Sequence, residues 1–90
     1  MKIQYADTAV ENLKKFNSAD RVLIVKKIHY LADNFEVLKT GKKLRELKGT
    51  EYKNQYRFTI ARKIRAIFRI EDERLILIVL RIGLRKDVYE

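Results

Sequence analysis

The 90-residue sequence contains no cysteine and no proline, and it has one histidine. Without cysteine the chain forms neither disulfides nor thiolate metal sites, which fits a reducing cytoplasm. A lone histidine, His29, excludes a paired-histidine nuclease and a His-ligated metal site, and we interpret it as structural. Also missing are a phosphate-cradling glycine loop, a dinucleotide fingerprint and a metal-ligand cluster, so we expect no metal and no small-molecule cofactor.

Long apolar runs are missing as well. The longest extends from Leu75 to Leu80, far short of the ~20 residues that a membrane span needs. Asp7 precedes any apolar run at the N-terminus, so we expect no signal peptide, no membrane partner and a cytoplasmic location. The length and the 47% apolar content predict one small domain over residues 1–90.

Acidic residues are scarce in the second half of the chain. Residues 1–38 carry six Lys or Arg and five Asp or Glu, whereas residues 39–90 carry 15 and seven. Nearly all of the net charge of +9 therefore lies in residues 39–90. Such segregation favours a nucleic-acid partner; the alternative is a charge that only keeps a small protein in solution.

The N-terminal half predicts a short strand and two helices. Residues 2–5 form the expected strand, and the spacing of Thr8 and Glu11 is typical of a capping box for a helix over about 8–16, with Val10 and Leu13 on its buried face. Ser18 is the expected N-cap of a second helix over about 18–35. Its apolar positions recur at helical spacing: Ile24, Ile28, Leu31 and Phe35.

A connector over residues 36–50 then leads into three strands. Apolar and polar residues alternate over 56–60 and 64–70, a pattern typical of strands with one buried face. Residues 71–74 predict a turn, and 75–82 are apolar on both parities, as in a central strand. The order β-α-α-β-β-β predicts an α+β domain in which two N-terminal helices pack on a mostly antiparallel twisted sheet.

The register of the first hairpin yields a sharper prediction. If residues 61–63 form its turn, Thr59 faces Arg65, and Arg57 faces Ile67. Arg57, Thr59, Arg65 and Arg69 then share the face away from the core, with Arg57 and Arg65 as diagonal neighbours. Such guanidinium groups suit a bound anion; the alternative is neutralisation by acids such as Glu51 or Glu71.

Taken in order, these residues make the sequence resemble toxins of the RelE/ParE superfamily, from type II toxin–antitoxin modules. The segments that carry the resemblance are Lys43-Leu44-Arg45-Glu46-Leu47-Lys48-Gly49, Tyr56-Arg57-Phe58, Ile64-Arg65-Ala66-Ile67-Phe68 and Arg81-Ile82-Gly83-x-Arg85-x-x-Val88-Tyr89. The likeness extends over nearly the whole chain, in size, element order and motif spacing.

For RelE-like members the resemblance implies a metal-independent endoribonuclease that cuts mRNA in the ribosomal A site, where the 2′-hydroxyl attacks the adjacent phosphate. The residues that match the family's site are Arg57, Arg65, Arg85 and Tyr89. Arg57 would contact the phosphate or assist deprotonation, Arg65 and Arg85 would clamp the phosphate, and Tyr89 would stack on a base or orient the 2′-hydroxyl. The alternative for Arg85 and Tyr89 is a structural cover over the end of the sheet.

The resemblance also implies partners. These are mRNA, the ribosome with its rRNA, and a cognate antitoxin with an acidic, partly disordered segment. The residues expected to contact RNA are Lys42, Lys43, Arg45, Lys48, Lys53, Arg62, Lys63, Arg81 and Lys86. For those of the connector, the alternative is a solvated surface. We interpret Gly83 as a bulge that redirects Arg85.

Two other functions remain open. One is a ParE-like toxin that inhibits DNA gyrase without cutting RNA, and the other is a degenerate member that binds only its antitoxin. Three positions depart from the residues common in RelE-like relatives: Thr59, Ile64 and Leu84. The set of Arg57, Arg65, Arg85 and Tyr89 favours the nuclease.

Overall fold

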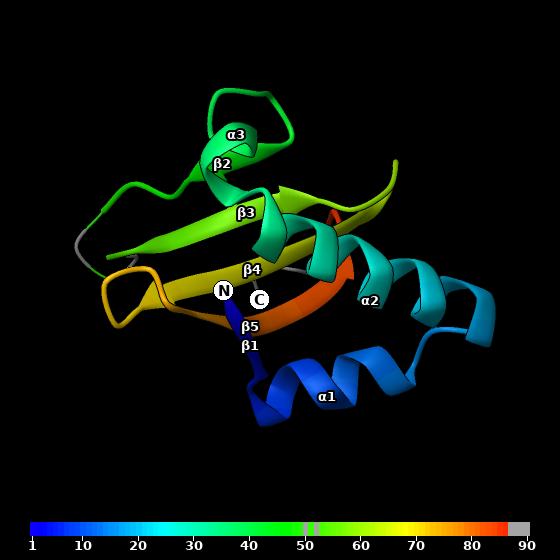
Figure 1. The fold of residues 1–90 in the computed structure, drawn as a ribbon. Helices are drawn as coiled ribbons and strands as arrows, with labels where there is room; N and C mark the ends of the chain where they lie inside the picture. Colours follow the sequence, from blue (N-terminus) through cyan, green and yellow to red (C-terminus); the bar gives the residue numbers. More distant parts are fainter. Residues whose placement is uncertain (50, 52, 87–90) are drawn as a thin grey trace.

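The computed structural model describes residues 1–86 except 50 and 52. The elements are β1 (Lys2–Tyr5), α1 (Asp7–Lys14), α2 (Ser18–Asp33), α3 (Phe35–Leu38), β2 (Leu44–Glu46), β3 (Gln55–Thr59), β4 (Ile64–Glu71) and β5 (Ile76–Leu84). The strands form one sheet, and α1 and α2 lie against one of its faces (Figure 1). The expected α+β architecture is confirmed.

The sheet has the strand order β1-β5-β4-β3-β2. β1 runs parallel to β5, and the other three pairs are antiparallel. β5 therefore has a strand neighbour on either side, as its apolar sequence predicts. The expected hairpin register is confirmed, because Thr59 pairs with Arg65 and Arg57 pairs with Ile67.

The core lies between the helices and one face of the sheet. The predicted stripe of α2 is confirmed: Ile24, Ile28 and Leu31 are fully buried. Phe35 closes one end of the core, with its ring edge-on to Tyr56 at 5.2 Å and to Phe68 at 6.2 Å. Such aromatic pairs add about 0.5–1.5 kcal/mol beyond the area that they bury.

A bulge interrupts the pairing of β5 with β4. Ile67 pairs with Arg81 while Phe68 pairs with Val79, so Leu80 is the extra residue. The prediction of a bulge at Gly83 is wrong, because Gly83 pairs in register with Arg65. The extra residue reverses which parity of β5 faces the core: Val79 is buried before it and Ile82 after it.

The first helix begins one residue earlier than predicted, and the second begins at Ser18, within the predicted range, but has a different cap. α1 begins at Asp7 after Ala6 and makes no side-chain cap, so the Thr8–Glu11 capping box is wrong. With this start Ala9 is buried, and Val10, predicted to be buried, is 38% exposed. α2 is capped by Asn17 rather than Ser18. None of the helices in the described part of the chain is long and apolar enough to cross a membrane.

The connector contains two short elements that the sequence analysis does not predict. α2 ends at Asp33, and Phe35 belongs to the separate helix α3. β2 adds three residues to the sheet edge, with Leu44 paired to Phe58 and Arg45 paired to Arg57. A strand this short shows too little alternation to be recognised, since only Leu44 in it is buried.

The β4–β5 turn contains three consecutive residues with left-handed backbone conformation. The φ angles are 53° for Asp72, 53° for Glu73 and 75° for Arg74. Arg74 forms an ion pair with Glu36, and its guanidinium lies 5.7 Å from the ring centre of Phe35. These contacts join the turn to α3 and hold a backbone that non-glycine residues rarely adopt.

The correction to the α2 cap gives a test with a matched pair. Asn17 Oδ1 accepts a hydrogen bond from the Asp20 amide at 2.8 Å. We expect Asn17→Ala to lower the free energy of unfolding by about 1 kcal/mol, because that amide loses its partner. Ser18→Ala should change it by less than about 0.5 kcal/mol. Urea denaturation followed by circular dichroism measures both, and equal losses would contradict the assignment.

Candidate nucleic-acid interface

The face of the sheet turned away from the helices is rich in arginine. Because side chains alternate along a strand, the residues beside buried Tyr56, Phe58 and Phe68 project to this open face. The arginines that do so are Arg45 on β2, Arg57 on β3, Arg65 and Arg69 on β4, and Arg81 on β5. The prediction of a shared face is confirmed, and pairing adds Arg45 and Arg81 to it.

The register aligns three of these arginines in one line. Arg45 pairs with Arg57, Arg57 with Ile67, and Ile67 with Arg81. We call Arg45, Arg57 and Arg81 the arginine row. It crosses four strands spaced ~4.8 Å apart, so its charges lie roughly 5 and 10 Å apart at the backbone.

An isoleucine lies in the middle of the arginine row. Ile67 is only 5% exposed, although it faces away from the helices and lies outside the main core. Its neighbours across the strands are Arg57 and Arg81, and Arg65 and Arg69 flank it along β4. The apolar stems of arginine can cover such a side chain while their charged ends stay accessible. Ile67 is therefore an apolar surface on which the arginine stems can pack.

Among the described residues, the one ion pair on this face lies at its Arg69 side. Arg69 Nε lies 2.8 Å from Glu71 Oε1. Arg57 forms no ion pair or hydrogen bond with any described residue, and its Nε is buried without a partner. In the described part of the chain, neutralisation by Glu51 or Glu71 therefore fails for Arg57, which leaves its charge available for an anion.

Arg65 is engaged with the β3–β4 turn. Its Nη1 donates to the carbonyl oxygens of Ala61 at 3.1 Å, Arg62 at 3.0 Å and Ile64 at 3.4 Å. Arg65 is expected to clamp a phosphate, but in the structure its Nη1 is already hydrogen-bonded to backbone carbonyl oxygens. Its strand partner is Gly83, which places no side chain beside it on the open face.

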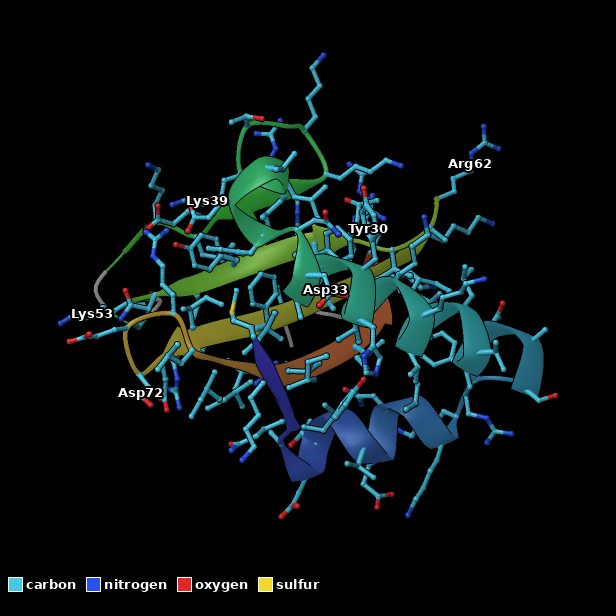
Figure 2. The ribbon with its side chains drawn as sticks, in the orientation of Figure 1. Tyr30, Asp33, Lys39, Lys53, Arg62 and Asp72 are labelled. Atoms are coloured by element: carbon cyan, nitrogen blue, oxygen red, sulfur yellow. The ribbon has the colours of Figure 1, made fainter. Side chains whose placement is uncertain are left out.

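A second cationic group lies at the end of the sheet where the β3–β4 turn is. The Lys63 carbonyl accepts a hydrogen bond from the Arg85 amide, and the Lys43 carbonyl accepts one from the Thr59 amide, both at 2.8 Å. We call this group the basic end. Its members are Lys42, Lys43, Arg62, Lys63, Arg85 and Lys86, all exposed. Arg62 projects into solvent from the tip of the turn (Figure 2).

Besides Arg65, two predicted residues of the described part of the chain, Lys48 and Lys53, join neither group. Lys53 lies near Asp72, at the opposite end of the sheet from Arg62 (Figure 2). Lys48 is also at that end, because it follows Leu47, whose amide donates to the Gln55 carbonyl at the start of β3. Tyr89 lies outside the described residues.

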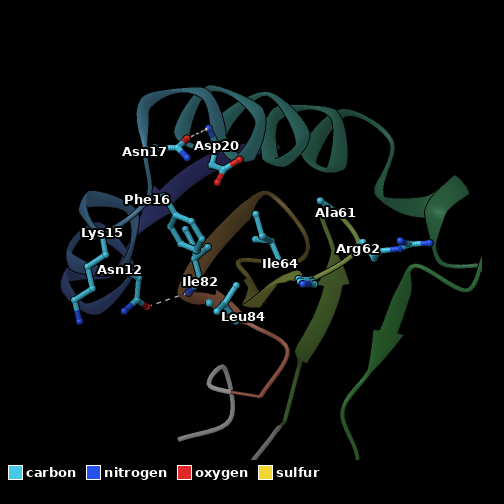
Figure 3. A pocket seen from close by; sticks show the side chains of 12 residues that line it. Asn12, Lys15, Phe16, Asn17, Asp20, Ala61, Arg62, Ile64, Ile82 and Leu84 are labelled. Atoms are coloured by element: carbon cyan, nitrogen blue, oxygen red, sulfur yellow. Dashed lines mark hydrogen bonds between the residues drawn. The ribbon is translucent and has the colours of Figure 1, made fainter.

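A groove that the sequence does not predict lies beside the basic end. It has a volume of about 680 Å³ and lies between the α1–α2 junction, the β3–β4 turn and the end of β5. Phe16, Ile64, Ile82 and Leu84 form an apolar surface, and Asn12 Oδ1 accepts a hydrogen bond from the Ile82 amide at 3.0 Å (Figure 3). Lys15, Arg62 and Lys63 line it as well. Phe16 at the end of a polar helix is the signal that could have indicated it.

Two tyrosines in the described part of the chain have raised pKa values. Burial raises the pKa of Tyr5, and burial together with nearby Glu46 raises the pKa of Tyr56, so both stay protonated. His29 is exposed on α2, on the helix side of the sheet. The described residues contain no cluster of His, Asp and Glu that could hold a metal ion.

Comparison with known proteins gives one family match. The model of ParE toxins of type II toxin–antitoxin systems (parDE) matches residues 3–89. No curated protein sequence matches the chain.

Several solved structures share the fold. The E. coli DinJ–YafQ complex includes a chain 15% identical, with TM-score 0.73 and coverage of 99% of this chain and 98% of that one. The archaeal RelE–RelB complex from Pyrococcus horikoshii OT3 includes a chain with 17% sequence identity and a TM-score of 0.70, and the match covers 97% of each chain. The intact E. coli RelBE toxin–antitoxin complex includes a chain with 19% identity and a TM-score of 0.67, and the match covers 92% of this chain and 94% of that one. At these identities the likeness shows the fold alone.

The like charges of the arginine row make a stability prediction. Arg57 lies directly opposite Arg45, an arrangement that destabilises a sheet. We expect Arg57→Gln to raise the free energy of unfolding by about 0.2–1 kcal/mol at low salt, with the gain vanishing near 1 M salt, where charges are screened. Arg69→Gln, which loses the pair with Glu71, should give no gain. Urea denaturation at two ionic strengths measures this, and a salt-independent effect would contradict an electrostatic origin.

Proposed function

The chain belongs to the family of ParE toxins of type II toxin–antitoxin systems, and from this premise we propose that it is an endoribonuclease that cuts mRNA in the ribosomal A site. The observation that carries the proposal is the arginine row, whose member Arg57 forms no ion pair with any described residue. Aligned guanidinium groups that lack an acidic partner among the described residues suit a polyanion. A polynucleotide backbone supplies the repeated anions that they lack.

The reaction we propose needs no cofactor. The 2′-oxygen forms a bond to the adjacent phosphorus, and the bond from phosphorus to the 5′-oxygen breaks. The 2′-hydroxyl loses its proton and the leaving 5′-oxygen gains one, which gives a cyclic phosphate and a 5′-hydroxyl end. Negative charge builds on the phosphate oxygens in the transition state, so Arg57 and Arg85 contribute by stabilising that charge.

The two cationic groups have different roles in this proposal. The arginine row binds the mRNA backbone at the sheet, and Ile67 keeps the arginine stems in place. The basic end reaches rRNA, because its side chains are exposed and project beyond the sheet. Phosphate contacts of both kinds position the substrate without reading its sequence.

We also propose an antitoxin partner. Solved chains of the same fold occur in toxin–antitoxin complexes, namely RelE with RelB and YafQ with DinJ. An acidic segment that orders on binding would cover Arg57 and Arg85, and its apolar side chains would fill the groove beside Phe16 and Ile82. One segment can thus neutralise the charge and anchor itself next to the site.

A second candidate function is inhibition of DNA gyrase, as for ParE-like toxins. It is favoured by the family model, which describes ParE toxins, and by three departures from RelE-like residues: Thr59, Ile64 and Leu84. Two assays separate the candidates. Toeprinting on programmed ribosomes detects A-site cleavage, and a supercoiling assay with purified gyrase detects inhibition. Cleavage without gyrase inhibition supports the nuclease, and the reverse result supports the ParE-like function.

Removal of single arginines tests the site. We expect Arg57→Ala and Arg85→Ala each to lower the rate of mRNA cleavage on ribosomes by about tenfold or more, because each removes a donor to the developing charge. Arg21→Ala, an equal charge loss on exposed α2, should cut at the parent rate. Thermal unfolding confirms that all three fold. Parent rates for both Arg57→Ala and Arg85→Ala would refute the assignment.

The salt dependence of RNA binding gives an independent test. We expect the affinity for single-stranded RNA to fall steeply between about 50 and 200 mM salt, because binding releases counterions. Each arginine that contacts a phosphate contributes about 0.7 to the slope of log affinity against log salt concentration. Arg57→Gln should lower the slope by that amount and Arg21→Gln should leave it unchanged. Fluorescence anisotropy gives the slopes, and identical values for the two variants would exclude Arg57 from the interface.

A further inference from the structure

We propose that Arg65 is a positioning residue, which fixes the β3–β4 turn and through it the backbone of Arg85. The structural part of this inference stands on the hydrogen bonds of the turn. The part that concerns cleavage rests on the function proposed above. It replaces the expected direct clamp on phosphate by an indirect role.

The first step is the turn itself. Residues 61–63 are Ala-Arg-Lys, so the turn has no glycine, proline or asparagine to set its backbone. None of the three has a positive φ, unlike the residues of the β4–β5 turn. Hairpins with three-residue loops usually need a left-handed residue. Local sequence therefore does little to define this conformation, and something else has to hold it.

Arg65 holds it. All four carbonyl oxygens of residues 61–64 have a donor. Arg65 Nη1 donates to the carbonyl oxygens of Ala61, Arg62 and Ile64. In the described part of the chain it is the only donor to the Arg62 carbonyl. A charged donor to a carbonyl makes a stronger bond than a neutral one. The side chain thus pins the turn from the open face of the sheet.

The second step leads from the turn to Arg85. The Lys63 carbonyl, the one that Arg65 does not bind, accepts the Arg85 amide at 2.8 Å. Arg85 follows the last residue of β5, Leu84, which pairs with Ile64. The position of Arg85 beyond the strand therefore depends on the position of Lys63, and that depends on the bonds of Arg65.

The charge of Arg65 agrees with this role. Its neighbours in the turn, Arg62 and Lys63, are cations that repel it. Three carbonyl dipoles offset that repulsion and partly compensate its charge. Arg57 has no such compensation in the described part of the chain. A phosphate therefore gains more from Arg57 and Arg85 than from Arg65.

Amide hydrogen exchange tests the structural part without any RNA. We expect the Arg85 amide to exchange about tenfold faster or more in Arg65→Ala, because the turn opens more often. Arg65→Lys, which keeps one charged donor, should restore part of the protection. Arg69→Ala is the matched control, since Arg69 lies four residues along the same strand, on the same face, but forms an ion pair with Glu71. The Ile70 amide, bonded to the Asn54 carbonyl at the far end of the sheet, reports overall stability.

A double-mutant cycle tests the functional part on ribosome-bound mRNA. If Arg65 acts through Arg85, adding Arg65→Ala to Arg85→Ala lowers cleavage by less than about twofold, although Arg65→Ala alone lowers it about tenfold. A direct phosphate contact instead multiplies the two losses and overturns the inference. Unchanged exchange at Arg85 in Arg65→Ala, or equal acceleration at Ile70, overturns it too. If the parent cuts no mRNA, the proposed function fails, and the exchange result alone decides whether Arg65 positions Arg85.

Discussion

The pairing register of β3 with β4 is the constraint on which the rest of the molecule depends. The helices cover only one face of the sheet, so each strand residue either enters the core or reaches the open face. A slip of one residue in this register would turn over the side chains of one strand, so that Arg57 would replace Phe58 in the core, or Arg65 and Arg69 would replace Phe68. The energy that packs the aromatic residues against α2 is therefore the same energy that aligns the arginines.

The like charges on the open face of the sheet reduce the stability of the fold. Arg57 opposite Arg45 is a pair that folding alone would not favour, and the strong core opposite tolerates it. Ile67, buried on this face with Arg57 and Arg81 as its cross-strand neighbours, gives arginine stems an apolar surface on which they can pack while their charged ends stay accessible. Among the described residues, Arg57 has no acidic partner that would offset this repulsion.

Much of this could be predicted from the sequence because the signals were periodic. The stripe from Ile24 to Leu31 and the alternation around Phe58 and Phe68 specified the helix, the hairpin and the open face. Features that depend on single contacts could not be predicted. The pattern indicates Ser18 as the cap of the second helix, whereas the structure has the neighbouring Asn17. β2 is too short to show a period, and the groove joins segments that are distant in sequence. The hydrogen bonds of Arg65 also cannot be predicted from the alternation of polar and apolar residues. An arginine that faces solvent and one that bonds to a turn occupy the same place in that pattern.

The bulge at Leu80 has a consequence for how β5 can vary. The strand is two half-strands of opposite phase, joined at one residue: odd positions such as Leu77 and Val79 serve the core in the first half, and Ile82 serves it in the second. Rules for tolerated substitution therefore invert midway. Position 81 lies on the open face and accepts a polar residue, whereas position 79, of the same parity, lies in the core. Removing or adding one residue between them would turn the side chains of one half of the strand to the opposite face. An aligned relative that lacks the extra residue would thus carry its cation one position away from Arg81, and simple column-by-column comparison would miss it.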